Sequence, residues 1–313
     1  MKHKIFLLVI VLILLAPANA RAAVLYFKPN QSSQNLGDTF IQEIRLNTEG
    51  EFINTAEIYI EYPQDILELA DFSNGNSVLS LWIENPEVKN GFIHFIAGVP
   101  AGYQGSDGFV AKMIFFTKTS SIQSDTANAD ALLGTIRFSE SSKILLNDGV
   151  GTLANVEFES ANVVIIPKLL SKVEDEWHDE IMLDSTSPEP FIVSVSKHKD
   201  IFGGKYFISF STVDKQTGID HYEVFEYFDG KVSETKNAAS PYLLDNQELN
   251  GIIRVRAVDK RGNEAISEIR LNNELESKTQ NRISKTAIPV FIFSVLLVCA
   301  SAIAIYAKKS RKK

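Results

Sequence analysis

Carboxylates and histidines are the side chains of this chain that could carry out acid-base chemistry. Glu57 and Glu61 lie four residues apart, and a pair of carboxylates can flank the bond that a glycosidase cleaves. Polar and apolar residues alternate around both of them, which predicts an open strand without the cleft that would raise the pKa of one acid. The sequence therefore predicts no catalytic residue, and the protein is not expected to be an enzyme.

A second group has the side-chain types of a metal site: Glu176, His178, Asp179 and Glu180. No second histidine and no cysteine lies at ligand spacing beside it, so the pattern favours a solvated face. Residues 214–220 do not form a calcium-binding EF-hand loop, because Gln216 and Gly218 stand where oxygen ligands are needed. The sequence predicts no metal site and no cofactor.

Charge and cysteine content limit the class of protein. The chain carries 39 Asp and Glu against 31 Lys and Arg, and eight of the basic residues stand before Ala23 or after Ala307. The part between them is strongly acidic, so a nucleic-acid partner is not expected. The single cysteine, Cys299, has no disulfide partner, so stability must come from hydrophobic cores, in about two domains for this length.

The first residues have the pattern of a secretory signal peptide. Lys2 and Lys4 precede an apolar stretch and then small residues, which predicts a signal peptide over residues 1–22. Cleavage is expected after Ala20 or Ala22, and the rest of the chain is expected to be exported.

The last residues have the pattern of a membrane anchor. Residues 287–307 are uncharged and long enough for a transmembrane helix. The basic residues 308–313 that follow predict a cytoplasmic tail, since cations beside a span stay inside. The localisation expected is the cell membrane, with a single span and the ectodomain outside.

Period-two alternation is the main structural signal between residues 24 and 166. In residues 56–62, apolar residues alternate with Glu57, Tyr59 and Glu61, as in a strand with one face in a core. Turn residues separate the strand candidates, and no amphipathic helix of useful length interrupts them. The sequence predicts an all-β sandwich of the jelly-roll kind. Further strand candidates are residues 24–27, 40–46, 79–83, 93–97, 109–116, 134–138 and 161–166.

Motifs in this region resemble the cohesin domain family, in the family's order. They are Leu36-Gly37-Asp38-Thr39 at a strand start, residues 62–69 at a corner, 91–97 in a hairpin strand, 107–116 in the next strand and 161–166 at the close. The corner departs from the family, because it reads Tyr-Pro-Gln-Asp in place of Tyr-Asp-Pro, and residues 120–130 enlarge one loop. The resemblance implies a non-catalytic cohesin-like jelly-roll sandwich over residues 23–167.

The resemblance also implies a partner and a binding face. Cohesins bind a calcium-loaded dockerin on one sheet, to which residues 56–62, 79–83, 92–97 and a strand beyond Asp130 would correspond here. The alternation by itself is equally consistent with a solvated strand face, and Trp82 could equally belong to the core. The candidates for the partner-binding face are Glu57, Tyr59, Glu61, Trp82 and His94.

A second module follows a break in the pattern. Residues 168–190 are predicted to be a linker that contains a short amphipathic helix around Trp177. Residues 191–272 again alternate as strands, and the strings at 217–224 and 253–264 resemble bacterial Ig-like and fibronectin-type modules, which implies an Ig-like β-sandwich that acts as a spacer. Residues 273–286 are predicted to be a stalk linker.

These predictions describe a membrane-anchored bacterial surface protein with two β-sandwiches and one C-terminal transmembrane helix. One hypothesis is that the first sandwich docks a secreted, dockerin-like protein. The alternative is carbohydrate binding on a polysaccharide, for which Tyr59, Trp82 and Tyr103 could form a platform. A coplanar strip of exposed aromatics would favour a sugar, and a mixed polar face would favour a protein.

Overall fold

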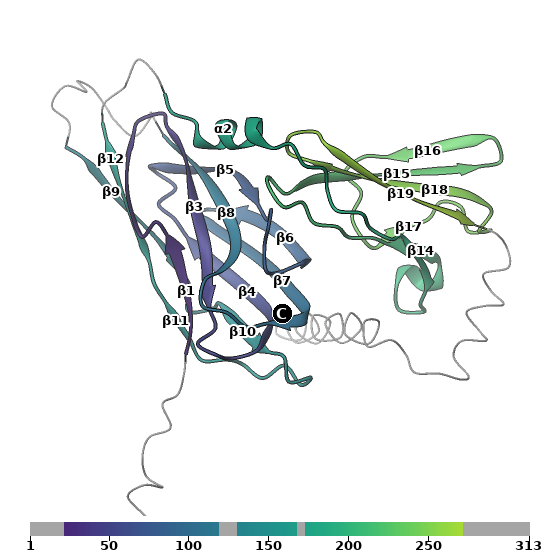
Figure 1. Cartoon of the computed structure of the whole chain (residues 1–313), viewed down its shortest axis with the longest axis horizontal. Helices are drawn as coiled ribbons and strands as arrows, with labels where there is room; N and C mark the ends of the chain where they lie inside the picture. The colour runs from purple at the N-terminus through teal and green to yellow at the C-terminus, as the bar shows by residue number, and fades with distance from the viewer. Residues whose placement is uncertain (1–21, 119–129, 168–172, 272–313) are drawn as a thin grey trace, which may run out of the picture.

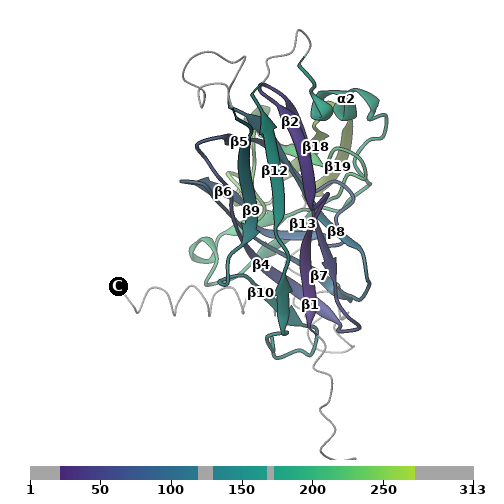
Figure 2. The same cartoon turned by 90° about the vertical axis from the view of Figure 1, so that its left-hand side faces the viewer.

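The N-terminal part of the chain folds as two stacked β-sheets. The structure is a computed structural model, and it describes residues 22–118, 130–167 and 173–271. The first sheet has the strand order β11-β1-β3-β8-β5, and the second has the order β2-β12-β9-β4-β7-β6, with β10 paired to β4 (Figures 1 and 2). The first sheet contains β1 (Ala23–Lys28), β3 (Thr39–Asn47), β5 (Leu67–Ser73), β8 (Gly108–Thr117) and β11 (Val156–Phe158). The second contains β2 (Gln31–Asn35), β4 (Ile53–Glu61), β6 (Leu81–Lys89), β7 (Phe92–Tyr103), β9 (Leu132–Phe138), β10 (Lys143–Leu146) and β12 (Ala161–Ile166).

Apolar side chains from both sheets fill the core between them. Alternate residues of β3 are buried along its whole length, as period-two alternation predicts. Phe27 of β1 stacks on Phe138 of β9, with ring centroids 4.2 Å apart, and so joins the two sheets. The predicted all-β sandwich is confirmed.

Four strands of this sandwich lie outside the predicted strand candidates: β5 begins within the predicted corner at residues 62–69, and β2, β10 and β11 are short or polar. β2 consists of Gln31-Ser32-Ser33-Gln34-Asn35 and pairs in parallel with β12, while β11 pairs in parallel with β1. β10 pairs with β4 over only four residues. Short or polar edge strands bury few apolar side chains, so they leave no hydrophobic pattern in the sequence.

The Gly37-Asp38 motif forms the corner between β2 and β3. Gly37 has φ of +86°, a conformation that glycine adopts without the steric penalty of a Cβ atom. The Asp38 side chain is buried, and its Oδ2 atom accepts hydrogen bonds from the backbone and side-chain nitrogens of Asn35, 2.9 and 3.0 Å away. Its Oδ1 atom accepts from the backbone nitrogen of Glu174 at 3.0 Å. One carboxylate therefore ties the β2–β3 corner to the segment after the sandwich.

We expect Asp38→Ala to lower the free energy of unfolding by about 2–4 kcal/mol, because three donors lose a charged acceptor in a buried place. Chemical denaturation of wild type and variant measures this difference. Glu140→Ala, on an exposed turn, is the control and should stay within about 0.5 kcal/mol of wild type. Equal stability of the Asp38→Ala variant and wild type would contradict the role given to this carboxylate.

A second β-sandwich with its own core follows in the chain. A sheet of order β13-β14-β17 faces a sheet of order β16-β15-β18-β19. Val224, Ile253 and Val255 of the larger sheet pack against Ile208 of the smaller one. The strands are β13 (Ser194–Lys197), β14 (Tyr206–Ser209), β15 (Ile219–Phe228), β16 (Lys231–Thr235), β17 (Tyr242–Leu243), β18 (Gly251–Asp259) and β19 (Glu264–Leu271), with a 3-10 turn, η2 (Phe202–Gly204).

The helix predicted in the linker is present as α2 (Glu176–Leu183). The Asp175 side chain caps its first turn by accepting from the backbone nitrogen of His178, as capping aspartates do. Trp177 is buried, and its indole nitrogen donates to Asp71 of β5 at 2.8 Å. Lys260 of the second sandwich donates to the same carboxylate at 2.7 Å. α2 thus packs on the first sandwich, beside the contact between Asp71 and Lys260, and at the opposite end of that sandwich from β10 (Figures 1 and 2).

Several predictions concern residues outside the described part. Residues 1–21 of the predicted signal peptide, the stalk after Leu271, the predicted span at 287–307 and the tail at 308–313 belong there, as does most of the loop at 120–130. Within the described ranges, no helix is both long and apolar enough to cross a membrane. The predicted domain boundaries stay predictions.

Candidate functional site

Strand β4 presents the predicted polar residues on the outer face of the second sheet. Ile58 and Ile60 are fully buried in the core, so Glu57, Tyr59 and Glu61 point the other way. In the register of β4 and β7, Tyr59 lies opposite His94. The structure therefore brings four of the five candidate residues together on one face.

Three of these side chains brace one another at the centre of the face. The rings of Tyr59 and His94 are stacked, with centroids 4.1 Å apart and planes 17° apart. The Tyr59 hydroxyl donates to Glu57 Oε1 at 2.8 Å, and Lys143 of β10 donates to Glu57 Oε2 at 3.0 Å. The Glu57 side chain is only 10% exposed, so it is not the freely solvated residue that the alternation allowed. These contacts hold the side chains at the centre of the face in place without a bound partner.

More exposed side chains form a rim around this centre. Glu61 pairs with Arg137 of β9, whose side chain is 64% exposed. Glu84 of β6 is half exposed and lies 3.8 Å from His94 Nδ1. Phe92, opposite Glu61 on β7, is 48% exposed and adds an apolar element. The face thus combines an aromatic centre with a rim of both charges.

Ser142 is a positioning residue that the sequence did not reveal. It lies in the turn between β9 and β10, two strands that both pair with β4. Its hydroxyl accepts from the backbone nitrogen of Tyr59 at 3.0 Å and donates to the Tyr59 carbonyl at 3.1 Å. A serine in a polar turn carries no sequence signal for this role.

Trp82 is the candidate that lies on the core side, which is one of the two places that the sequence allowed. It lies opposite Ala97 in the register of β6 and β7, on the core side of the sheet. Its ring packs against Phe72 and Phe95, with centroids 5.6 and 5.2 Å away. Tyr103 is also partly buried against the core. Trp82, Tyr103 and Tyr59 therefore do not form one coplanar exposed strip.

The acidic cluster of α2 also contacts the first sandwich. Glu176 accepts from the backbone nitrogen of Ile41 at 3.0 Å, and Glu180 pairs with Lys112 of β8. Glu176, His178 and Asp179 are exposed and Glu180 is half-buried, so the face is solvated as predicted, while two of its acids also attach the helix to the first sandwich.

The pKa values of Glu57 and Tyr59, at the centre of the face, are shifted in opposite directions. Burial would raise the pKa of Glu57, but hydrogen bonds from Lys143 and Tyr59 outweigh it and hold that pKa below its usual value. Burial and the hydrogen bond to Glu57 raise the pKa of Tyr59. The centre of the face therefore carries an ionised Glu57 and a neutral Tyr59 at neutral pH.

Glu57→Gln is expected to destabilise the chain by about 1–2 kcal/mol at pH 7, because a charged acceptor of two hydrogen bonds is lost. Since folding lowers the pKa of Glu57, its contribution is complete above the unfolded value near 4.5 and is lost as the pH falls through the folded value. The difference between wild type and variant should therefore shrink below pH 4.5. Urea unfolding at several pH values measures it, with Glu84→Gln as the exposed control. A difference that stays constant into acid would contradict the assignment.

Comparison with known proteins gives matches to solved structures alone. No family model matches the chain, and no curated protein matches it. A non-cellulosomal cohesin from Archaeoglobus fulgidus is 15% identical and has a TM-score of 0.38, over 47% of this chain and 92% of that one. The sequence motifs that resemble the cohesin family lie in the N-terminal sandwich. We call it the cohesin-like sandwich.

Two further cohesins give similar values. A cohesin from Clostridium thermocellum, solved in a cohesin-dockerin complex, is 16% identical with a TM-score of 0.38, over 46% of this chain and 94% of that one. The cohesin module of a family 33 glycoside hydrolase from Clostridium perfringens is 14% identical with a TM-score of 0.34, over 50% of this chain and 97% of that one. These matches do not confirm the Ig-like assignment of the second sandwich, which stays a prediction.

Proposed function

We propose that the cohesin-like sandwich is a non-catalytic docking module that binds a secreted protein through the outer face of β9, β10, β4, β7 and β6. The observation that carries the proposal is the composition of this face. Tyr59 and His94 form a braced centre, and Glu61, Arg137 and Glu84 surround it. Protein interfaces commonly have this arrangement of an aromatic centre within a charged rim.

The same observation disfavours the carbohydrate hypothesis. A polysaccharide-binding face needs exposed aromatic rings in a row, and Trp82 and Tyr103 pack against the core instead. The Tyr59 hydroxyl is already bonded to Glu57. The face therefore supports a protein partner better than a sugar.

The proposed partner class is a dockerin. The sequence motifs that resemble cohesins support this class, and several of the similar solved structures are cohesins in complex with a dockerin. Because the corner at residues 62–65 departs from the motif of the family, the test uses a panel of dockerins.

The proposed setting is the outside of a cell membrane. It is supported by the signal-like pattern of residues 1–22 and the apolar run at 287–307 followed by basic residues. The second sandwich would then hold the docking face away from the membrane.

The test is capture by the full chain, immobilised in detergent. It is exposed to culture medium proteins and to a panel of purified dockerins, with calcium or with a chelator, and in parallel to insoluble polysaccharides. Retention of a dockerin with calcium and its release by chelator is the expected result. Retention on polysaccharide without capture of any dockerin would contradict the proposal.

A further inference from the structure

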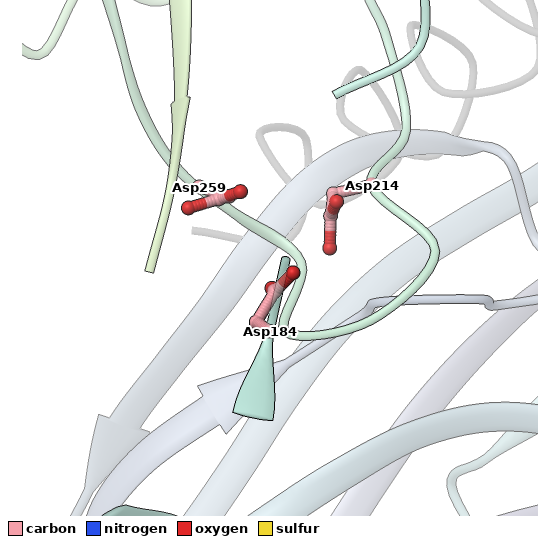
Figure 3. A group of neighbouring side chains, drawn as sticks. All are labelled: Asp184, Asp214 and Asp259. Atoms are coloured by element: carbon pink, nitrogen blue, oxygen red, sulfur yellow. The ribbon is translucent and has the colours of Figure 1, made fainter. Parts of the chain in front are cut away.

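Three aspartates from three separate segments meet where the two sandwiches join. Asp184 follows α2, Asp214 lies in the loop between β14 and β15, and Asp259 ends β18. All three are buried, with exposed fractions of 5%, 1% and 2%. One carboxylate oxygen of each lies within 4.8 Å of the others, and Figure 3 shows the three side chains turned toward one another.

Backbone and side-chain donors hold two of the carboxylates in place. Asp184 Oδ2 accepts from the Thr217 backbone nitrogen at 3.1 Å and from the Thr217 hydroxyl at 2.5 Å. Asp259 Oδ1 accepts from the backbone nitrogens of Arg261 and Asn263 at 2.9 and 2.8 Å. Fixed carboxylates of this kind do not have to be reoriented when they coordinate an ion.

Asp214 provides the observation that points to a ligand. Its Oδ2 atom accepts from the backbone nitrogens of Gln216 and Gly218, each 2.8 Å away. Its Oδ1 atom is buried and has no hydrogen-bond partner among the described residues. A buried carboxylate oxygen without a partner is costly, and here it belongs to a side chain turned toward two further acids.

Among the described residues, the three carboxylates have no positive charge between them to balance their own. Burial, and to a lesser degree the carboxylates of Asp184 and Asp259, raise the pKa of Asp214, although backbone donors oppose the shift. Three buried carboxylates repel one another, and a cation between them would remove the repulsion and satisfy the free oxygen. The donors are all oxygen, which suits a hard cation.

We propose that Asp184, Asp214 and Asp259 bind a calcium ion at the junction of the two sandwiches. Calcium takes oxygen ligands at about 2.3–2.6 Å, so two oxygens on one ion can be as much as about 5 Å apart, and the observed spread fits. Magnesium needs shorter distances and near-ideal octahedral geometry, which three carboxylates on separate segments supply less readily. Backbone oxygens or water would complete the coordination.

The place of the site gives the ion a structural role. Ser73 at the end of β5 donates to the Thr217 carbonyl at 2.5 Å, and the Asn76 nitrogen donates to the Asp214 carbonyl at 3.0 Å. The loop that supplies Asp214 therefore also contacts the cohesin-like sandwich. A Cβ atom on Gly75 would lie 2.3 Å from the Gln216 carbonyl oxygen, so the two surfaces are in close contact. The ion would join the linker to the second sandwich and fix the angle between the two modules.

The test uses the full chain in detergent, with calorimetric melting in chelator, in about 5 mM CaCl2 and in about 5 mM MgCl2, which exceeds the Kd range of extracellular calcium modules. Calcium is expected to raise the melting temperature by about 5 °C or more, and magnesium by less. Isothermal titration with CaCl2 should show one bound ion.

Asp214→Asn separates the proposal from a purely structural role. The new amide keeps the size of the side chain, removes one charge and can donate to the neighbouring acids. The variant is expected to melt at or above the wild-type temperature in chelator and to lose the response to calcium. Asp229→Asn, in the exposed β15–β16 turn, is the control and should respond as wild type does.

Three results would overturn the proposal. They are a wild-type melting temperature equal in calcium and chelator with no heat of binding, an equal response to magnesium, and an undiminished calcium response in Asp214→Asn. Docking on the outer face of β4 is measured separately, by capture of a dockerin, and the failure of either proposal leaves the other standing.

Discussion

Tyr59→Ala is expected to raise the Kd for the docked protein about 30-fold or more, a loss of about 2 kcal/mol of binding free energy. Tyr59 is at the centre of the proposed face, where it stacks on His94 and donates to Glu57. Removal of the ring leaves His94 without its stacking partner and Glu57 without one of its two side-chain donors. Central aromatic residues dominate the binding energy of protein interfaces. Calorimetric titration with the captured dockerin measures the change.

Tyr26→Ala is the matched control for this prediction. Tyr26 is half-buried on the outer face of the opposite sheet, and its hydroxyl also donates to a carboxylate, that of Asp107, at 2.6 Å. Burial and that bond raise the pKa of Tyr26 to about 12, much as Tyr59 is affected. The two variants should lose similar stability, but Tyr26→Ala should bind as wild type. Equal loss of binding in both would contradict the assignment of the face.

Phe95→Ala is expected to lower the free energy of unfolding of the cohesin-like sandwich by about 3–5 kcal/mol. The Phe95 ring is fully buried and lies against Phe72 of the opposite sheet and Trp82 of the neighbouring strand. Its removal leaves a cavity between the sheets, and β7 loses the apolar contacts that this ring makes with β5 and β6. Denaturant unfolding followed by tryptophan fluorescence measures the loss, since both tryptophans of the chain, Trp82 and Trp177, contact this sandwich.

Phe92→Ala is the control for that loss. It lies on the same strand, but its side chain is on the outer face and 48% exposed, so its truncation should cost within about 0.5 kcal/mol. If both phenylalanine variants had the same stability, the core would not depend on the contact between Phe95 and the two aromatic rings.

The fold could be predicted from the sequence where apolar residues alternate. β3 buries every second residue, and β4 alternates between buried isoleucines and half-buried polar residues from Ile58 to Glu61, so alternation predicts both strands and their orientation. β2 and β11 are fixed by parallel pairing with distant strands, which local residue patterns do not encode. The corner at Gly37-Asp38 was recognisable, but the reason for it, a carboxylate shared with Glu174, depends on tertiary contacts.

The candidate face could be predicted in part for the same reason. Alternation predicts that Glu57, Tyr59, Glu61 and His94 point outward, as they do, but the contact between Tyr59 and His94 depends on the register of β4 with β7. The side of the sheet on which Trp82 lies could not be predicted, because β6 has irregular register next to it. The junction aspartates, Asp184, Asp214 and Asp259, come from three segments, and no spacing in the sequence reveals such a cluster.

The most direct test of the account is hydroxyl-radical footprinting of the full chain with and without the captured dockerin. The method reports the solvent exposure of individual side chains in the folded protein. We expect Phe92, Tyr59 and His94 to become protected in the complex, while Tyr26 on the opposite sheet keeps its reactivity. Protection of Tyr26 with no change at Phe92, Tyr59 and His94 would contradict docking on the outer face of β4 and β7.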